Sequence, residues 1–282
     1  MADPLLSVVR DGVRIYDLSR PYLQGMPQSP NHPTFGRTMP RRHGDHVRAD
    51  GGSAANDLLI LGTHVGTHID ALAHISHHGV LHGGADAASE QQVGFPDHGI
   101  HVFPPMLGRA LLLDVPRALG VSSCEPGQEI RPEDLDAALD LTETRPAAGD
   151  VLLVRSGWGA RWEDGPAYVG AGSGVPGVGA AGARWLAEHR PRAVGADTIA
   201  FERIAPGAGH TLLPAHRILL VEHGINIIES MDLEEIAHVG LTEFALALIP
   251  LPLVGATGSP VRPLAIVPAG ARDVPTASTE PH

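Results

Sequence analysis

Apolar residues occur along this chain in short runs that are separated by turn residues, and no internal repeat is visible. Runs of about five to seven apolar residues next to Gly, Pro or Asp are typical of buried strands. This pattern predicts strands at residues 13–18, 56–62, 109–115, 151–156, 193–196, 225–230, 243–253 and 263–267. Prolines break the strand that is predicted at 243–253.

Helices are predicted between these strands. Pro132 and Pro214 each stand where the first turn of a helix accepts proline, and Gly224 ends the second of these helices. Two more helices are predicted at residues 180–189 and 232–237. Because strands and helices are mixed throughout and no linker separates two halves, we expect one α/β or α+β catalytic domain over residues 1–270 and a flexible tail at 271–282.

The amino-acid composition predicts long loops and argues against some kinds of binding partner. With 34 Gly and 25 Pro among 282 residues, we expect many turns and ordered loops, including the polar segment at 20–40. The net charge of −12 disfavours nucleic acid, because phosphate would be repelled. No apolar run is long enough to span a membrane, and the N-terminal segment lacks the pattern of a signal peptide. The single cysteine, Cys124, fits a reducing compartment, so a cytoplasmic location is expected.

Several classes of catalysis are excluded by missing residues. The chain contains no lysine, so all 20 basic residues are arginine. Schiff-base chemistry, pyridoxal phosphate and a phosphate-binding P-loop each need a lysine amine. The chain lacks the G-x-S-x-G motif that would indicate a serine esterase. The glycine-rich segment at 170–177 resembles a nucleotide loop only superficially, and we interpret it as a loop at the surface or over a substrate.

Metal-binding residue types concentrate in the segment HVGTHIDALAH, which holds His64, His68, Asp70 and His74. Imidazole and carboxylate are the usual protein ligands of Zn²⁺ and Mn²⁺. His68 and Asp70 are two residues apart, so on an extended segment they face the same side, and Gly66 allows the bend that returns His64 to the same point. The spacing predicts a metal site of His64, His68 and Asp70 with room for water.

His74 lies four residues further on, near this set but not necessarily on the metal, and it is predicted to transfer protons. Water on such an ion loses a proton near neutral pH. A histidine titrates in the range that lets it accept this proton and pass it to a leaving group. The alternative interpretation is a polar loop without metal, because His77, His78 and His82 follow closely.

The same segment resembles the signature H-x-G-T-H-x-D-x-P-x-H of the metal-dependent cyclase/hydrolase family, which includes bacterial kynurenine formamidase and isatin hydrolase. Leu72 stands where the signature has proline, which affects the local turn and pocket shape and not the metal ligands. The likeness continues in order along most of residues 14–267, through the segments at 16–33, 195–202, 216–233 and 250–266.

The resemblance implies a compact α/β fold of the swivelling β/β/α type, with a mixed sheet and long loops. It also implies roles for the matching residues. The first two histidines and the aspartate of the signature bind metal, and its last histidine acts in proton transfer. In this sequence these positions are His64, His68, Asp70 and His74.

Further positions match the family outside the signature. Members with two zinc ions use a His and a Glu that match His216 and Glu229, whereas other members hold one manganese, so one ion and two ions both stay open. The alternatives are a histidine on a helix surface and a carboxylate at a strand end. Glu202 is interpreted as a residue that supports the metal site or contacts substrate, or equally as a surface carboxylate.

These features together predict an enzyme, a metal-dependent hydrolase that opens a small amide, lactam, imide, formamide or lactone with a metal-activated water. One alternative is a cyclase that closes a ring with loss of water at the same site. Another is a metal- or ligand-binding protein without turnover. The expected partners are a small-molecule substrate and further copies of the chain, as a homodimer or homotetramer, with no nucleic acid and no membrane.

Overall fold

The computed structural model describes residues 4–142 and 144–270, so the tail predicted at 271–282 lies outside the described residues. Within them, one mixed sheet has nine strands in the order β1-β13-β11-β5-β7-β9-β10-β4-β12. These strands are β1 (Val13–Asp17), β13 (Leu264–Pro268), β11 (Glu243–Leu248), β5 (Met106–Asp114), β7 (Val151–Arg155), β9 (Ala193–Ala196), β10 (Asn226–Glu229), β4 (His68–Asp70) and β12 (Gly258–Pro260).

The centre of the sheet is parallel and its two sides are antiparallel. Strands β5, β7, β9 and β10 run parallel, whereas β11 and β4 pair antiparallel with the outer strands of this group. Successive residues of β5 point to opposite faces and are buried on both: Leu111 and Leu113 belong to one core cluster, and Ala110 and Leu112 to the other. Burial on both faces explains the continuous apolar runs of the central strands.

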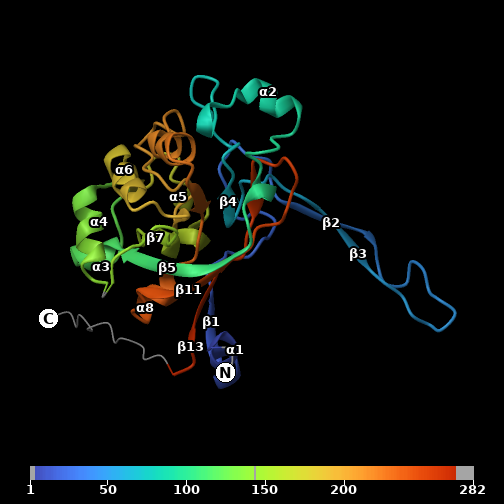
Figure 1. Cartoon of the computed structure of the whole chain (residues 1–282). Helices are drawn as coiled ribbons and strands as arrows, with labels where there is room; N and C mark the ends of the chain where they lie inside the picture. Colours follow the sequence, from blue (N-terminus) through green and yellow to red (C-terminus); the bar gives the residue numbers. More distant parts are fainter. Residues whose placement is uncertain (1–3, 143, 271–282) are drawn as a thin grey trace.

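Helices cover one face of this sheet more fully than the other (Figure 1). The first core cluster lies under α4 (Pro132–Leu139), α6 (Ala180–Glu188) and the π-helical turn η4 (Arg217–Glu222), which continues α7 (Pro214–His216). On the other face, α8 (Glu234–His238) packs with residues of β1, β11 and β13. The remaining short helices are α1 (Pro4–Asp11), α2 (Ala87–Gln92), α3 (Val115–Leu119), α5 (Pro166–Val169), η1 (His82–Gly84), η2 (Ile100–Val102) and η3 (Trp158–Asp164).

An arm projects from the body of the molecule (Figure 1). It is the antiparallel pair of β2 (Gly36–Arg41) and β3 (Asn56–Ile60), which forms a sheet of its own. Every residue of β3 is exposed, and Leu58, Leu59 and Ile60 are each at least half exposed. We call residues 36–60 the β2–β3 arm. A strand was predicted at 56–62, and within the described chain no residue of β3 is buried on either side.

The predicted α/β class with a mixed sheet is confirmed by this architecture. Several elements were not predicted, among them α1, β12 and β2, which begins in the segment predicted to be a loop at 20–40. Helix α1 has no buried residue, and β12 lies in a segment that was predicted to be a turn but pairs with β4. The short strands β6 (Glu129–Ile130) and β8 (Gly177–Val178) form a further small sheet. The boundary of the single domain at residue 270 stays a prediction.

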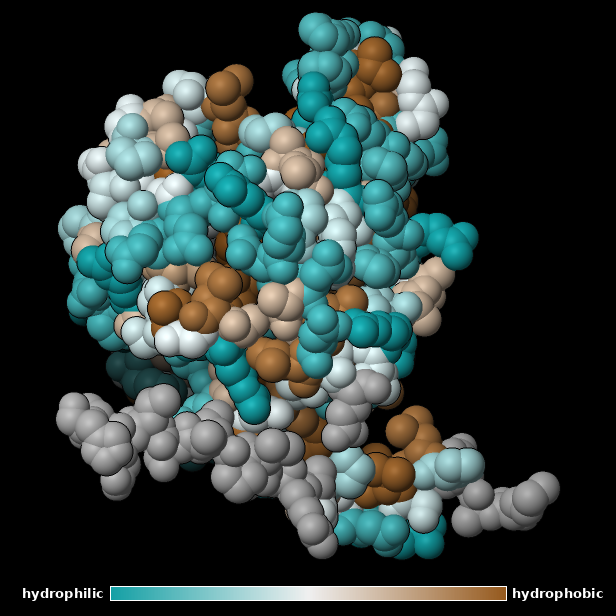
Figure 2. Space-filling model, turned by 90° about the vertical axis from the view of Figure 1, so that its left-hand side faces the viewer, coloured by the Kyte–Doolittle hydropathy of each residue, from teal (hydrophilic) through white to brown (hydrophobic). Residues whose placement is uncertain are grey.

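The surface is mainly polar on the face that Figure 2 shows, where apolar side chains form separate small groups. Within the described residues, no helix combines the length and the apolar character that crossing a membrane requires.

Candidate metal centre

Strand β4 carries two of the predicted ligands into the interior. His68 and Asp70 point to the same side of the strand, as their spacing predicted, and their exposed fractions are 2% and 1%. The bend before the strand depends on Gly66, which has φ of +62°. A Cβ at this position would lie 2.8 Å from the Tyr22 ring, so the turn requires glycine for its conformation and for the close approach.

Strand β10 brings the C-terminal carboxylate to the same place. In the antiparallel pair of β4 and β10, Glu229 lies directly opposite His68. Residues that face each other across antiparallel strands are close neighbours on one face of the sheet. His216 reaches this point from α7, so three elements from distant parts of the sequence meet around Asp70.

The ligand atoms of this group are spaced as they would be around one ion. His68 Nε2 lies 3.5 Å from Asp70 Oδ1 and 3.4 Å from Glu229 Oε2. His216 Nε2 lies 3.6 Å from Asp70 Oδ2 and 3.1 Å from Glu229 Oε1. Atoms that bind one Zn²⁺ tetrahedrally at about 2.0–2.1 Å lie roughly 3.3 Å apart. Asp70, His216 and Glu229 therefore fit a divalent cation, and His68 Nε2 lies beside them within 3.5 Å of both carboxylates.

Three of these atoms also lack any other partner. His68 Nε2, Asp70 Oδ2 and Glu229 Oε1 are buried and make no hydrogen bond. Buried polar atoms are nearly always satisfied, because an unpaired one costs the full loss of its hydration. A cation between them would satisfy all three, so the fit rests on unpaired atoms as well as on distances.

A second group of ligand atoms shares Asp70 with the first and consists of His64, Asp70 and His74. His64 Nδ1 lies 2.7 Å from Asp70 Oδ1, and the His74 ring stacks on the His64 ring at 3.8 Å between centroids. The carboxylate of Asp70 thus stands between two sets of donors. This arrangement can hold two ions with Asp70 between them, or one ion with the other imidazoles beside it.

His74 therefore lies inside the cluster and not only near it. Burial lowers the pKa of His74 to about 3, so its ring is neutral at neutral pH. A neutral imidazole can either bind a metal or accept a proton. The structure places the predicted proton-transfer residue within reach of the site, and its role stays a prediction.

Supporting hydrogen bonds fix the orientation of the ligands. The Nδ1 atom of His68 donates to the carbonyl oxygen of Gly66 at 2.8 Å, which leaves Nε2 free to bind metal. The Nδ1 atom of His216 lies 2.7 Å from Glu202 Oε2. Burial lowers the pKa of His216, but the contact with Glu202 and the charges of Glu202 and Glu229 outweigh it and hold this pKa well above its usual value.

Glu202 is a supporting residue of the centre and not a surface carboxylate, since its exposed fraction is 1%. It accepts hydrogen bonds from the backbone N–H groups of Ala215 and His216 as well as contacting the His216 ring. Phe201, just before it, has φ of +56°, a conformation that non-glycine residues rarely adopt. The interpretation of Glu202 as a metal-site support fits this geometry, and the alternative as a surface residue is wrong.

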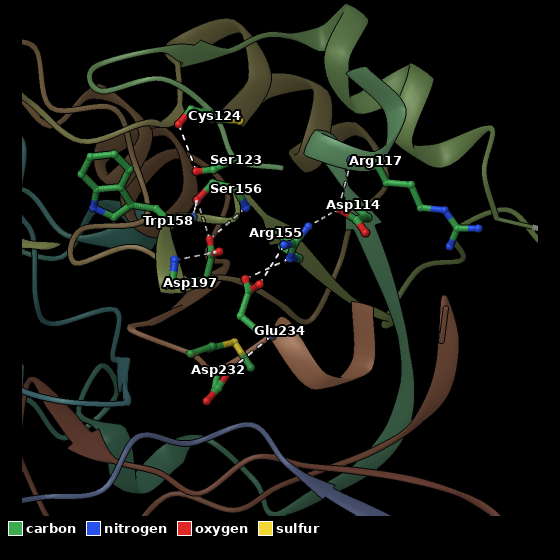
Figure 3. A network of polar contacts seen from close by, with 12 residues as sticks. Asp114, Arg117, Ser123, Cys124, Arg155, Ser156, Trp158, Asp197, Asp232 and Glu234 are labelled. Carbon is green, nitrogen blue, oxygen red and sulfur yellow. Dashed lines mark hydrogen bonds and ion pairs between the residues drawn. The ribbon is translucent and has the colours of Figure 1, made fainter. Parts of the chain in front are cut away.

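A second buried carboxylate organises the neighbouring strand ends. Asp197, which follows β9, accepts hydrogen bonds from the backbone N–H and the hydroxyl of Ser156 (Figure 3). It also accepts one from the backbone N–H of Gly159. Nearby, Arg155 is held between Asp114 and Glu234. Asp197 therefore joins the ends of β7 and β9, next to the segment that carries Glu202.

The metal centre lines a cavity of about 160 Å³. Two loops complete its wall. Their histidines, His32 and His210, were not predicted from the sequence. The added lining residues include Ser29, Asn31, His32, Ile199, His210 and Leu213. Residues 20–40 were predicted to shape the pocket, but no spacing pattern singled out His32 there, and His210 is isolated in its loop. The segment at 170–177 does not line this cavity.

Comparison with known proteins agrees with this geometry. A family model described as putative cyclase matches residues 16–203, more than half of the chain. The chain belongs to this cyclase family. The predicted resemblance is thereby confirmed, and the matched region contains the whole HVGTHIDALAH segment.

Relatives in the cyclase family include hydrolases. A kynurenine formamidase of Geobacillus thermodenitrificans is 28% identical over 215 residues, which cover 76% of this chain and 81% of the relative. An isatin hydrolase of Roseibium aggregatum is 26% identical over 231 residues, 78% of each protein. The crystal structure of a novel cyclase matches with a TM-score of 0.80 at 30% identity and covers 94% of this chain and 93% of that chain. At the level of the family, these relatives support metal-dependent amide hydrolysis.

Proposed function

We propose that this member of the cyclase family is a metal-dependent hydrolase that opens a small amide, lactam, imide, formamide or lactone. The observation that carries the proposal is the set of buried, unpaired ligand atoms of His68, Asp70 and Glu229, which His216 completes. The hydrolase names of the two relatives support the choice of reaction. The metal is proposed to be zinc or manganese, as one ion or two, because His and carboxylate ligands suit both.

In such a reaction, different residues of the chain bind the metal, orient its ligands and transfer the proton. When bound, the ion supplies Lewis acidity to water and to the substrate carbonyl. Asp70 and Glu229 would hold it as carboxylate ligands, and Glu202 keeps His216 in the orientation that would present Nε2 to it. His74, which stacks on His64 beside Asp70, is positioned to accept a proton from the attacking water and to return it to the leaving nitrogen or oxygen.

Elemental analysis and a hydrolysis screen test this proposal. Purified protein is expected to contain zinc or manganese, to open at least one cyclic amide, formamide or lactone, and to lose this activity on chelation. The variant His74→Ala should keep the metal and lose turnover. Full activity in His74→Ala would contradict the role of His74, and protein that binds no divalent cation would contradict the hydrolase assignment.

Isotope-labelled water separates hydrolysis from ring closure. A hydrolase incorporates the labelled oxygen of water into the product, whereas a cyclase that closes a ring releases water. Label in the product is expected. A product without label, formed with loss of water, would reverse the proposed direction of the reaction.

We also propose that the chain forms a homo-oligomer through the β2–β3 arm. A two-stranded ribbon with neither face covered is marginally stable in water, and Leu58, Leu59 and Ile60 are exposed on both faces of β3. A second copy of the chain would cover them. Size-exclusion chromatography with light scattering should show a dimer or tetramer, and Leu59→Asp should shift it toward the monomer. A monomeric native protein would contradict this proposal.

A further inference from the structure

Part of the wall of the cavity is formed by two loops that meet at one histidine, His210. Ser29 Oγ lies 3.4 Å from His210 Nδ1, and Asn31 Nδ2 lies 3.1 Å from the same atom. Ser29 is buried, with 3% of its surface exposed, whereas Asn31 stands at the exposed rim. The loop at 20–35 and the loop that follows residue 203 are therefore fastened to each other at His210.

These contacts fix the tautomer of His210. An amide nitrogen can only donate, so His210 Nδ1 must accept, and the proton of the neutral ring is then on Nε2. Burial lowers the pKa of His210, which favours this neutral form. Within the described residues, the His210 ring makes two hydrogen bonds, both at Nδ1, and none at Nε2. His210 thus offers an oriented N–H donor in the wall of the cavity that contains the metal centre.

The rest of this wall is unsuited to a charged substrate. Ile199, Ala200 and Leu213 are apolar, and none of the described residues that line the cavity is an arginine, in a chain that has no lysine. A carboxylate or ammonium group placed against these side chains would have no partner of opposite charge, and burying an unpaired charge is strongly unfavourable. The part of the cavity next to Ile199, Ala200 and Leu213 therefore favours uncharged groups, whereas the charged lining residues are the metal ligands Glu229 and His216.

The size of the cavity limits the substrate further. A cavity of roughly 150 Å³ holds one benzene ring, and this cavity has about 160 Å³, part of which borders the metal ligands. One five- or six-membered ring fills it. A fused two-ring compound would extend beyond this space.

We propose that His210 binds the substrate by donating a hydrogen bond from Nε2 to a carbonyl oxygen, and that the cavity takes an uncharged amide, imide or lactone with a single ring. This inference rests on the proposed hydrolase function and deepens it. The donor engages a carbonyl oxygen of the substrate, and Ser29 and Asn31 act as positioning residues because they hold the ring from its other nitrogen.

A panel of three probes tests the substrate class. Glutarimide is an uncharged single ring, isatin has two fused rings, and 2-formamidobenzoate is a formamide with a negative charge. Zinc- or manganese-loaded protein should bind glutarimide in calorimetry at least about tenfold more tightly than the other two, and hydrolyse it with the highest kcat/KM. Preference for isatin or 2-formamidobenzoate, or failure to bind glutarimide, overturns the inference.

Variants test the role of His210 separately. His210→Ala should keep its metal content, raise KM for glutarimide about tenfold and change kcat much less, because one hydrogen bond to the bound substrate is lost. His210→Asn retains an N–H donor and should recover part of the affinity, while Asn31→Ala should cost less than His210→Ala. His238→Ala, on the exposed end of α8, is the matched control for loss of a histidine and should behave as the native protein.

Two outcomes distinguish failure of this inference from failure of the hydrolase proposal. If glutarimide binds in a manner that depends on His210 but is not hydrolysed, the inference stands and the reaction assignment falls. If His210→Ala binds glutarimide as tightly as the native protein does, the role of His210 is overturned even when the enzyme hydrolyses its substrates.

Discussion

Strands β3 and β4 are neighbours in the sequence, but one is exposed to solvent and the other is buried. They are separated only by residues 61–67, yet all five residues of β3 are exposed and all three residues of β4 are buried. The exposed strand is the more apolar of the two: β3 is NDLLI and β4 is HID. Ordinary hydrophobic patterning would have assigned their environments the other way round.

The difference shows what decides burial in this molecule. Strand β4 is buried because it pairs with β10 on one side and β12 on the other, and both partners come from the last quarter of the chain. Strand β3 pairs only with β2, which is itself an edge. A run of apolar residues thus predicted the strand β3 in the arm. The pairing partners of β3 and β4 decided that β4, and not β3, is buried and carries metal ligands.

The largest effect is expected from removing the carboxylate that the two ligand groups share. Asp70→Asn should lose the metal and reduce kcat roughly a thousandfold, because Asp70 belongs to both groups. Asp57→Asn is the same change in β3, where the side chain only pairs with exposed Arg37 at 2.8 Å. This control should retain metal and activity in elemental analysis and steady-state kinetics. Equal loss in both variants would mean that β4 has no special role.

A smaller effect is expected one step away from the ligands. Glu202→Gln removes the charge that holds His216, and such supporting residues typically contribute ten- to a hundredfold to metal affinity. Competition with a fluorescent chelator measures this change. Glu235→Gln, an exposed change on α8, should leave the affinity unaltered. Native affinity in Glu202→Gln would show that the histidine is oriented without the carboxylate.

Metal binding should depend on pH in a defined direction. The pKa of His216 is held well above its usual value in the metal-free protein, so the ion must displace a proton from this ring. Affinity should therefore rise with pH, by about tenfold per unit for each proton released, until the raised pKa of His216 is passed. Titration of the metal between pH 6 and 8 checks the slope. An affinity that does not change over this interval would contradict a protonated His216.

The smallest effect is expected in the arm. Leu59→Asp changes an exposed side chain of β3, far in the fold from the ligands on β4 and β10, and should leave the metal content per chain unaltered even when the oligomer dissociates. Elemental analysis of the separated species measures this. Loss of metal in this variant would show that the arm contributes to the centre and that the contrast between β3 and β4 is incomplete.

Much of the fold and half of the centre were open to prediction from the sequence. Pro132 and Pro214 marked helix starts that the structure has, and the strands at 151–155 and 193–196 have the predicted positions. His64, His68, Asp70 and His74 could be grouped because they lie within one short segment. His32 and His210 could not, because each stands alone in a loop with no local pattern around it.

The sequence by itself determined which atoms are available near Asp70, because a glycine bend and a strand of alternating side chains bring nearby residues together through local geometry. Tertiary structure alone decided that Glu229 lies opposite His68, that His216 reaches the same point, and that His210 lines the same cavity. Those contacts join residues more than a hundred positions apart. Strand pairing and core packing, which no local pattern encodes, set their distances.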